Sequence, residues 1–268
     1  MKRIRHLGWL TIAATGLWTA PATAAAIQTI KVTVSNLSPS KGTYITPVWV
    51  GFHDGTFTTF TPGAPASQGI ERLAEDGDPG TISGDFTASG AGTTQGVLFG
   101  PVVPQIAPGQ STSMTFQLDP TDPLNRYFSF LSMVIPSNDA FIGNANPASR
   151  PIFDAAGNFV ASNFIVLGSM VWDAGTEVND EMPANTAFFG QASPNTGVTE
   201  NGIVAIHSGY NPPGSGGILD DSMFANADFK AQGYQVASIT FSQVPEPGTV
   251  WLLAVGLGLT RLYRRYRR

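Results

Sequence analysis

Two acidic loops carry the residues of this sequence that are best suited to chemistry. The first, residues 136–143, contains Asp139, and the second, residues 172–181, contains Asp173 and Glu177. Calcium prefers about six to eight oxygen ligands from carboxylates, carbonyls and water, held on flexible loops. Asp173 and Glu177 lie four residues apart around a glycine, so both can turn towards one ion, and Asp139 can add a third carboxylate. The spacing alone also fits ordinary turns, because Asp-Ala-Gly and Asn-Asp favour them.

A second interpretation of these loops is catalytic. Paired carboxylates of the 173–181 loop could act as the acid and base of an envelope hydrolase that cleaves polysaccharide. His53 beside Asp54, and His207 beside Ser208, are further candidates for a base, but each is typical of a strand end next to a turn. A catalytic histidine also needs a third group to orient it. The chain has neither a Gly-x-Ser-x-Gly nucleophile turn nor a His-Glu-x-x-His helix.

Strand-like segments supply the framework that must position these loops. In the first of them, Ile30, Val32 and Val34 share one face, as the buried side of a sheet requires. Eight such segments, separated by turn residues, are expected at residues 27–35, 44–52, 96–103, 111–118, 127–135, 163–171, 202–207 and 235–242. Their spacing favours an all-β fold, a two-sheet antiparallel β-sandwich of about eight strands.

One short helix is expected at residues 67–74, ending before Gly77, with a weak local ion pair among Glu71, Arg72 and Glu75. The glycine-rich stretches 83–96 and 208–217 are expected to be long surface loops. Four aromatic side chains are expected in the core, with a sugar-stacking platform as the alternative: Trp49, Phe52, Phe57 and Phe60.

The N-terminus, residues 1–26, has the pattern of a secretory signal peptide. Basic residues precede a moderately apolar run at 7–20, and small residues at 22–24 supply a cleavage pattern. Cleavage after Ala24 and cleavage after Ala26 fit equally well. Glycine and threonine dilute the apolar run, which makes an uncleaved anchor the weaker alternative.

The C-terminus, residues 244–268, contains Pro245, Glu246 and Pro247, then a short apolar helix and a cluster of five arginines. The apolar part is about half the ~20 residues that a stable membrane span needs, and the arginines mark a cytoplasmic end. The segment resembles the PEP-CTERM sorting signal of bacterial envelope proteins. The resemblance implies transient membrane association, processing by an exosortase-type protease, and attachment outside the cell or release. An ordinary C-terminal anchor is the alternative.

The domain between these two signals, residues 27–243, is long enough for one large core and is strongly acidic. Eight of the 14 lysines and arginines lie in the terminal segments, which leaves six against nearly all of the 19 acidic residues. Such a domain repels phosphate backbones, so we expect no nucleic-acid binding. The chain has no cysteine, which excludes disulfides, cysteine-ligated zinc and iron–sulfur clusters.

Four blocks of this domain resemble the spondin N-terminal domain, in the order of that family: Thr46-Pro47, residues 66–77, residues 129–139 and residues 172–177. The resemblance implies a β-sandwich with a calcium ion at one edge, as found in extracellular-matrix and adhesion proteins. Carried over by position, the family's calcium-binding acids match Asp139, Asp173 and Glu177. This sequence departs from the pattern twice, since Ala140 is inserted after Asp139, and glutamate replaces aspartate at 177 and so lengthens the side chain.

The sequence therefore predicts an exported, non-enzymatic, calcium-binding domain that is retained in or near the cell-surface matrix. An extracellular polysaccharide or matrix component would be its partner. The hydrolase, and a purely structural component whose acidic face keeps it soluble, are the alternatives. Carboxylates that converge within ~2.3–2.6 Å of one ion would favour calcium. Two carboxylates about 5–10 Å apart in a cleft would favour the hydrolase.

Overall fold

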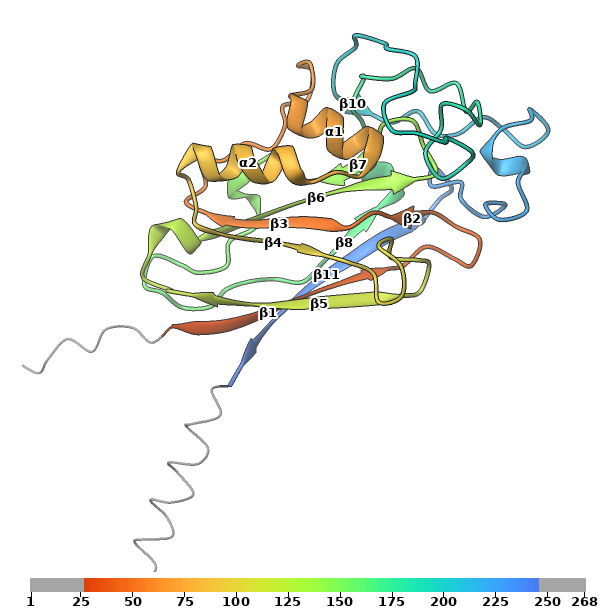
Figure 1. Ribbon diagram of the computed structural model, residues 1–268. Coiled ribbons are helices and arrows are strands. Elements are labelled where there is room, and N and C mark those ends of the chain that lie inside the picture. The colour runs from red at the N-terminus through yellow and green to blue at the C-terminus, as the bar shows by residue number, and fades with distance from the viewer. Residues whose placement is uncertain (1–26, 246–268) are drawn as a thin grey trace, which may run out of the picture.

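Two antiparallel β-sheets and two α-helices make up the part of the chain that the computed structural model describes, residues 27–245 (Figure 1). The expected signal peptide, and all of the expected C-terminal segment beyond Pro245, lie outside these residues. The strands are β1 (Gln28–Asn36), β2 (Tyr44–Ile45), β3 (Val48–His53), β4 (Thr94–Leu98), β5 (Ser111–Leu118), β6 (Tyr127–Ile135), β7 (Ala140–Gly143), β8 (Phe164–Leu167), β9 (Trp172–Asp173), β10 (Ala205–Ile206) and β11 (Gln235–Val244). The helices are α1 (Gln68–Asp76) and α2 (Gly80–Ser89), with short 3-10 turns at η1 (Pro123–Asn125), η2 (Pro147–Ser149), η3 (Gly168–Met170) and η4 (Ile218–Asp220).

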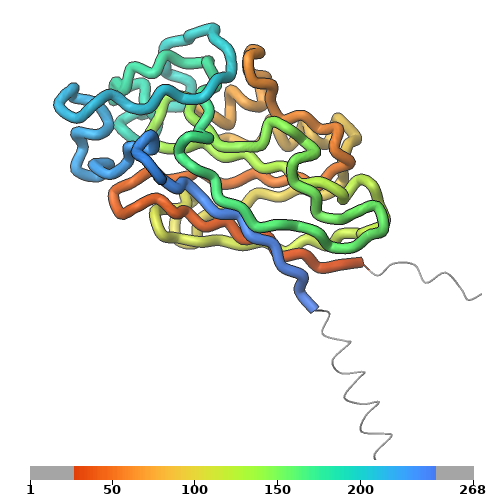
Figure 2. The backbone as a smooth tube through the Cα atoms, turned by 180° about the vertical axis from the view of Figure 1, so that it is seen from behind, coloured from red at the N-terminus to blue at the C-terminus, as the bar shows by residue number. Residues whose placement is uncertain are grey.

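The smaller sheet has the strand order β5-β1-β11-β8. Its second strand, β1, pairs with β5 on one side and β11 on the other, with Val32 opposite Met114 and Phe241. The alternation predicted for β1 is confirmed, because Ile30 and Val34 are buried together with Val32. Strands β1 and β11 lie side by side (Figure 2), so both ends of the described chain leave the domain at one end.

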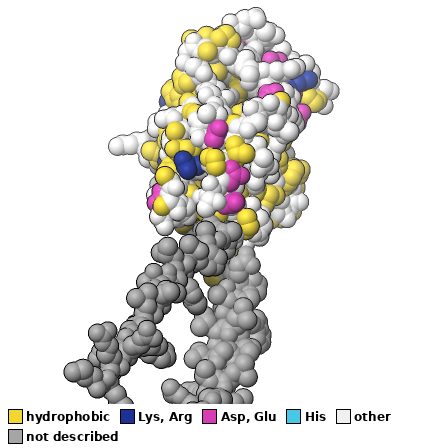
Figure 3. All heavy atoms as spheres, turned by 90° about the vertical axis from the view of Figure 1, so that its left-hand side faces the viewer, with side chains coloured by type: hydrophobic (Ala, Val, Ile, Leu, Met, Phe, Trp, Pro, Cys, Tyr) yellow, Lys and Arg dark blue, Asp and Glu magenta, His cyan; other side chains and the backbone are white. Residues whose placement is uncertain are grey.

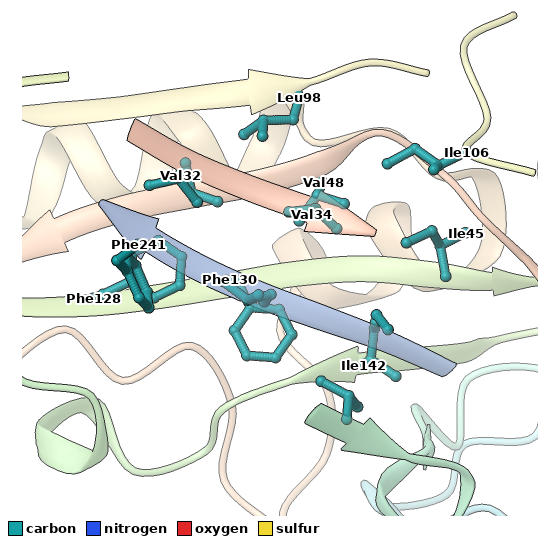
Figure 4. Packing of buried hydrophobic residues seen from close by; sticks show 14 of the residues in the cluster. Val32, Val34, Ile45, Val48, Leu98, Ile106, Phe128, Phe130, Ile142 and Phe241 are labelled. Carbon is teal, nitrogen blue, oxygen red and sulfur yellow. The ribbon is translucent and has the colours of Figure 1, made fainter. Parts of the chain in front are cut away.

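The larger sheet has the order β10-β9-β7-β6-β3-β4, and β2 also pairs with β6. Between the two sheets lies the main hydrophobic core, to which Val32 and Phe241 contribute from one sheet and Phe128 and Phe130 from the other (Figure 4). The rings of Phe128 and Phe241 meet edge to face, with centroids 4.9 Å apart. This contact across the layers confirms the predicted β-sandwich.

A second core, on the outer face of the larger sheet, was not predicted. There α1 and α2 cover the sheet and pack against Trp49, Leu131 and Phe141 (Figure 1). Both faces of β6 are therefore covered, and nearly the whole strand is buried. The two-layer expectation is incomplete, because the described domain has a helical third layer.

Helix α2 corrects two expectations, the single short helix and the loop at residues 83–96. Its glycines, serines and threonines are poor helix formers. However, Ile82 and Phe86 lie four residues apart and are both buried, and Phe86 meets Trp49 edge to face at 5.4 Å. Tertiary packing of such a face stabilises a helix that propensity alone does not. Gly90 ends the helix in a left-handed conformation, with φ of 67°.

Helix α1 forms where the sequence predicts it. The Ser67 hydroxyl caps its first turn by accepting a hydrogen bond from the Ile70 amide at 3.3 Å. Gly77 ends it with φ of 67°, a conformation that glycine adopts without strain. Arg72 forms a local ion pair on this helix as expected, but its partner is Asp76, at 3.1 Å, where Glu71 or Glu75 was expected.

The predicted strands are less accurate where the observed strands are short. The segment expected at 44–52 is interrupted at Thr46-Pro47, and those expected at 163–171 and 202–207 shorten to β8 and β10. Strands β7 and β9 were missed, although they carry the two acidic loops. Strands as short as β7 and β9 are defined by backbone pairing with their neighbours, which leaves little side-chain periodicity to detect.

Within residues 27–245, no helix has the length and apolar character needed to cross a membrane. On the face shown in Figure 3, acidic and basic side chains are scattered, and uncharged atoms make up most of the surface. The four aromatic residues expected in the core are buried, as predicted. Phe52 lies in the main core, and the second core contains Trp49, Phe57 and Phe60.

Candidate functional site

The pairing of β7 with β9 brings the two acidic loops together. Ala140 of β7 lies opposite Asp173 of β9, so the preceding residue, Asp139, sits beside the start of the second loop. The amide of Ala174 donates to the carbonyl of Asp139 at 3.2 Å. The turn before β7 is closed by the Ser137 hydroxyl, which donates to the Val134 carbonyl at 2.6 Å and accepts from the Ala140 amide at 3.1 Å.

Asp139 is fully buried and only half satisfied. Its Oδ2 accepts hydrogen bonds from the Thr176 amide at 2.8 Å, the Thr176 hydroxyl at 3.2 Å and the Glu177 amide at 3.1 Å. Its Oδ1 has no hydrogen-bond partner. Burial, and then the charge of Asp173, raise the pKa of Asp139 to about 7, against the effect of these hydrogen bonds. The site therefore disfavours a second negative charge and lacks a positive one.

Asp173 is held by a chain of polar contacts. Its Oδ1 accepts from the Gly175 amide at 2.7 Å, and its Oδ2 accepts from Asn179 Nδ2 at 2.6 Å. Asn179 Oδ1 lies 3.1 Å from His207 Nε2, and His207 Nδ1 accepts from the Gly209 amide at 2.9 Å. Because Nδ1 accepts, Nε2 carries the proton and donates to Asn179. Burial lowers the pKa of His207 to about 4, against the opposing charge of Asp173.

His207 therefore supports Asp173 as a neutral donor, and sequence reasoning had treated it only as a strand-end histidine or a base. The contact to Asn179 was missed, since nothing in the spacing of residues 173, 179 and 207 indicates it. His53 is likewise buried, with Nε2 2.9 Å from the Ser129 hydroxyl and Nδ1 accepting from the Gly55 amide at 3.0 Å. No carboxylate hydrogen-bonds to either ring within the described residues.

Glu177 lies in the same loop as Asp173, but its side chain contacts a different segment of the chain. Its Oε1 accepts from the Gly197 amide at 3.0 Å, and its Oε2 is buried without a partner. Burial, and then the charge of Glu75 on α1, raise the pKa of Glu177 to about 7. The charges of Asp139 and Asp76 add to this effect.

Glu177 lines a pocket of about 410 Å³ between α1 and the loops around residues 175–177 and 195–202. We call it the α1 pocket. Residues that define it include Pro65, Ala66, Glu71, Glu75, Glu177 and Gly197. Glu75 is also buried, and its pKa is raised chiefly by that burial. Sequence reasoning had assigned Glu75 only to local pairing along the helix.

The three predicted calcium ligands are thus close in the fold without converging. Asp139 and Asp173 form a pair, while the carboxylate of Glu177 enters the α1 pocket. Within residues 27–245, no group of three or more histidine, aspartate or glutamate side chains is placed to hold one metal ion. The pair itself suits a cation, because Asp139 Oδ1 is buried without a partner and no basic side chain of residues 27–245 forms an ion pair with either acid. The only ion pair of the described residues is Arg72–Asp76.

Comparison with protein families gives two matches. The Spondin_N family model matches residues 34–190, more than half of the chain, including α1 and both acidic loops. The PEP-CTERM protein-sorting motif matches residues 243–268. Neither is a family of enzymes. A comparison with curated proteins finds no match.

Proposed function

The chain belongs to the Spondin_N family, and from this membership and the geometry of Asp139 we propose that it is a calcium-binding, non-enzymatic surface domain with an adhesive or structural role. Together with the sorting motif, the family identifies an exported protein, at the cell surface or secreted. What the domain binds outside the cell is part of the proposal, with an extracellular polysaccharide or matrix component as the expected partner.

The observation that carries the calcium proposal is the unpartnered Oδ1 of Asp139. A buried carboxylate beside a second carboxylate is costly unless a cation or a proton compensates it. Asp139 and Asp173 would hold the ion, and the ion would neutralise both charges and tie the β6–β7 turn to the loop after β9. Oxygen-only ligands and flexible loops suit calcium better than magnesium, which demands a tighter octahedron. Glu177 stays a predicted third ligand.

The place of the pair in the fold agrees with a role at a surface. Both ends of the described chain leave from one end of the sandwich, whereas β6 runs towards the opposite end, where the loop with Asp139 follows (Figure 1). A domain attached through its C-terminal segment would therefore present the acidic loops away from the attachment point.

We propose further that an exosortase-type protease recognises Pro245, Glu246 and Pro247 and removes the tail. The sorting motif is consistent with this partner. Intact-mass analysis of the exported protein checks it. The arginine-rich end should be absent from the wild type and present when these three residues are replaced by alanine.

Calcium titration of the exported protein, by calorimetry and by thermal unfolding, tests the site. Extracellular modules bind calcium with Kd of about 10⁻⁴–10⁻³ M. At tenfold excess over Kd, binding adds about 1.4 kcal/mol to the free energy of unfolding, a melting shift of a few degrees. Asp173→Asn should abolish the shift, and magnesium should restore little of it.

Asp228→Asn is the matched control, because Asp228 is exposed and its Oδ1 accepts only the Lys230 amide, at 3.0 Å. This variant removes the same charge and should retain the shift. Identical melting of the wild type and Asp173→Asn, with and without millimolar calcium, would refute the proposal.

A further inference from the structure

The α1 pocket is a second acidic feature, separate from the Asp139–Asp173 pair. It opens between α1 and the loops near β10, which lie next to each other in Figure 1. The amide of Asn195 donates to Asp76 Oδ1 at 3.1 Å and joins the loop to the helix. Backbone hydrogen bonds join residues 175–178 to residues 198–202, for example from Val178 N to Val198 O at 2.7 Å, and these two segments line the pocket opposite α1.

Glu177 is aimed into this pocket and is held there. The side chain is 4% exposed, and its Oε2 has no hydrogen-bond partner although it lines an open space. A Cβ atom added to Gly197 would lie 2.0 Å from the carboxyl carbon of Glu177. Glycine at 197 is therefore what leaves room for the carboxylate, whose Oε1 accepts the Gly197 amide.

The acidic charge of the pocket is only partly compensated within the described domain, by Arg72 acting on Glu75. Glu71 and Glu75 lie four residues apart on α1, so both project from the side of the helix that faces the pocket. Glu177 lines the same pocket from the loop opposite. Among residues 27–245, no basic side chain lines the pocket, and the nearby Arg72 pairs with Asp76. An occupant with a positive charge would satisfy Glu177 Oε2 and relieve the repulsion among the three acids.

The shape of the pocket selects among cations. A bare metal ion needs its ligands to converge, and the described residues hold no group of three acids that does so. A guanidinium is wider, presents five N–H donors in a plane and can bridge carboxylates that are spread apart. It is also more weakly hydrated than an ammonium, so it enters a half-enclosed site at lower cost. Pro65 and Ala66 offer apolar surface for the methylene stem of an arginine.

We propose that the α1 pocket binds the guanidinium of an arginine side chain on a partner protein, with Glu75 and Glu177 as its main acceptors. The pocket shares Glu177 with the predicted calcium ligands, but neither Asp139 nor Asp173 lines it. It gives the domain a contact for a basic protein segment.

Calorimetry and NMR titration of the processed protein in saturating calcium test this, with acetyl-Gly-Arg-Gly-amide as the probe. The control probe replaces arginine by citrulline, which has the same shape without the charge. The arginine peptide should bind and the citrulline peptide should not. Glu75→Gln and Glu177→Gln should each weaken binding about tenfold or more, as expected for loss of a charge-assisted hydrogen bond.

Gly197→Ala separates geometry from charge, because it keeps all acids but displaces the Glu177 carboxylate, and it too should weaken binding. Asp228→Asn, which removes an exposed charge elsewhere, should bind as the wild type does. Equal binding of the two peptides, or unchanged binding in Glu75→Gln, would overturn the proposal. Competition between calcium and the arginine peptide, with calcium affinity lowered in Glu75→Gln, would show that the pocket is a metal site and would overturn it as well.

Discussion

The Asp139–Asp173 pair and the α1 pocket place the same chemistry in two different enclosures. In each, a buried carboxylate has one oxygen hydrogen-bonded to backbone amides and one without a partner, and in each burial raises the pKa to about 7. Around Asp139 the backbone of the Thr176 loop closes in, because the amides of Thr176 and Glu177 both donate to its Oδ2. Around Glu177 a space of about 410 Å³ opens. Asp139 and Glu177, which lie in different loops, thus face sites that differ in enclosure more than in charge.

The largest effect is expected from Asp139→Ala in chelator. This change leaves the buried amides of Thr176 and Glu177 without an acceptor, and each unsatisfied donor costs about 1–3 kcal/mol. The free energy of unfolding should fall by about 3 kcal/mol or more. Asp139→Asn keeps an acceptor oxygen and removes the repulsion with Asp173, so its loss should be much smaller. Denaturant unfolding measures both, and equal losses would mean that Asp139 does not organise the loop.

A smaller, pH-dependent effect is expected from Glu177→Gln in chelator. Because the folded-state pKa of Glu177 is about 7 and its ordinary value is 4.5, the folded state binds more protons between these pH values. Glu177 therefore costs no stability below pH 4.5, and the cost grows as pH rises to 7. Glu177→Gln should gain on the wild type across this window, by about 1–2 kcal/mol at pH 8, because solvent screens part of the charge. Denaturant unfolding at pH 4.5, 6 and 8 measures the gain.

The buried histidines are an internal control for this pH series. Burial lowers the pKa of His53 and of His207 to about 4, from the ordinary 6.5. A depressed histidine pKa contributes stability that is complete above pH 6.5 and is lost as pH falls towards 4. This trend has the opposite sign to that of Glu177. It is common to the wild type and Glu177→Gln, so it cancels in the difference between their free energies of unfolding. A difference independent of pH would contradict the burial of the Glu177 charge.

The smallest effect is expected from Arg72→Ala. The Arg72 side chain is partly exposed, and an ion pair of this kind, four residues apart on a helix, contributes about 0.3–0.5 kcal/mol. Thermal unfolding in low salt should show a shift of that order, and the shift should fade in high salt. A loss above about 2 kcal/mol would show that Arg72 neutralises the α1 pocket. Arg72 would then have to be counted as part of the pocket, and no longer as one half of a separate surface ion pair.

Local patterns in the sequence were sufficient for several elements. The alternation of Ile30, Val32 and Val34 predicts β1, because a strand with one buried face needs a period of two. Helix α1 follows from the hydroxyl of Ser67 at its start and from Gly77 at its end, which act on neighbouring backbone groups. The two acidic loops also follow from local signals, because acidic and turn-forming residues adjoin apolar segments.

Local patterns thus sufficed to predict the β-sandwich, α1, the C-terminal sorting motif and the acids available for a site. The helix α2 could not be predicted in this way, because it depends on the packing of Phe86 against Trp49. The support of Asp173 by Asn179 and His207, and the entry of Glu177 into the pocket beside Glu75, likewise depend on tertiary contacts. These outcomes depend on contacts between segments up to about a hundred residues apart, which no local spacing encodes.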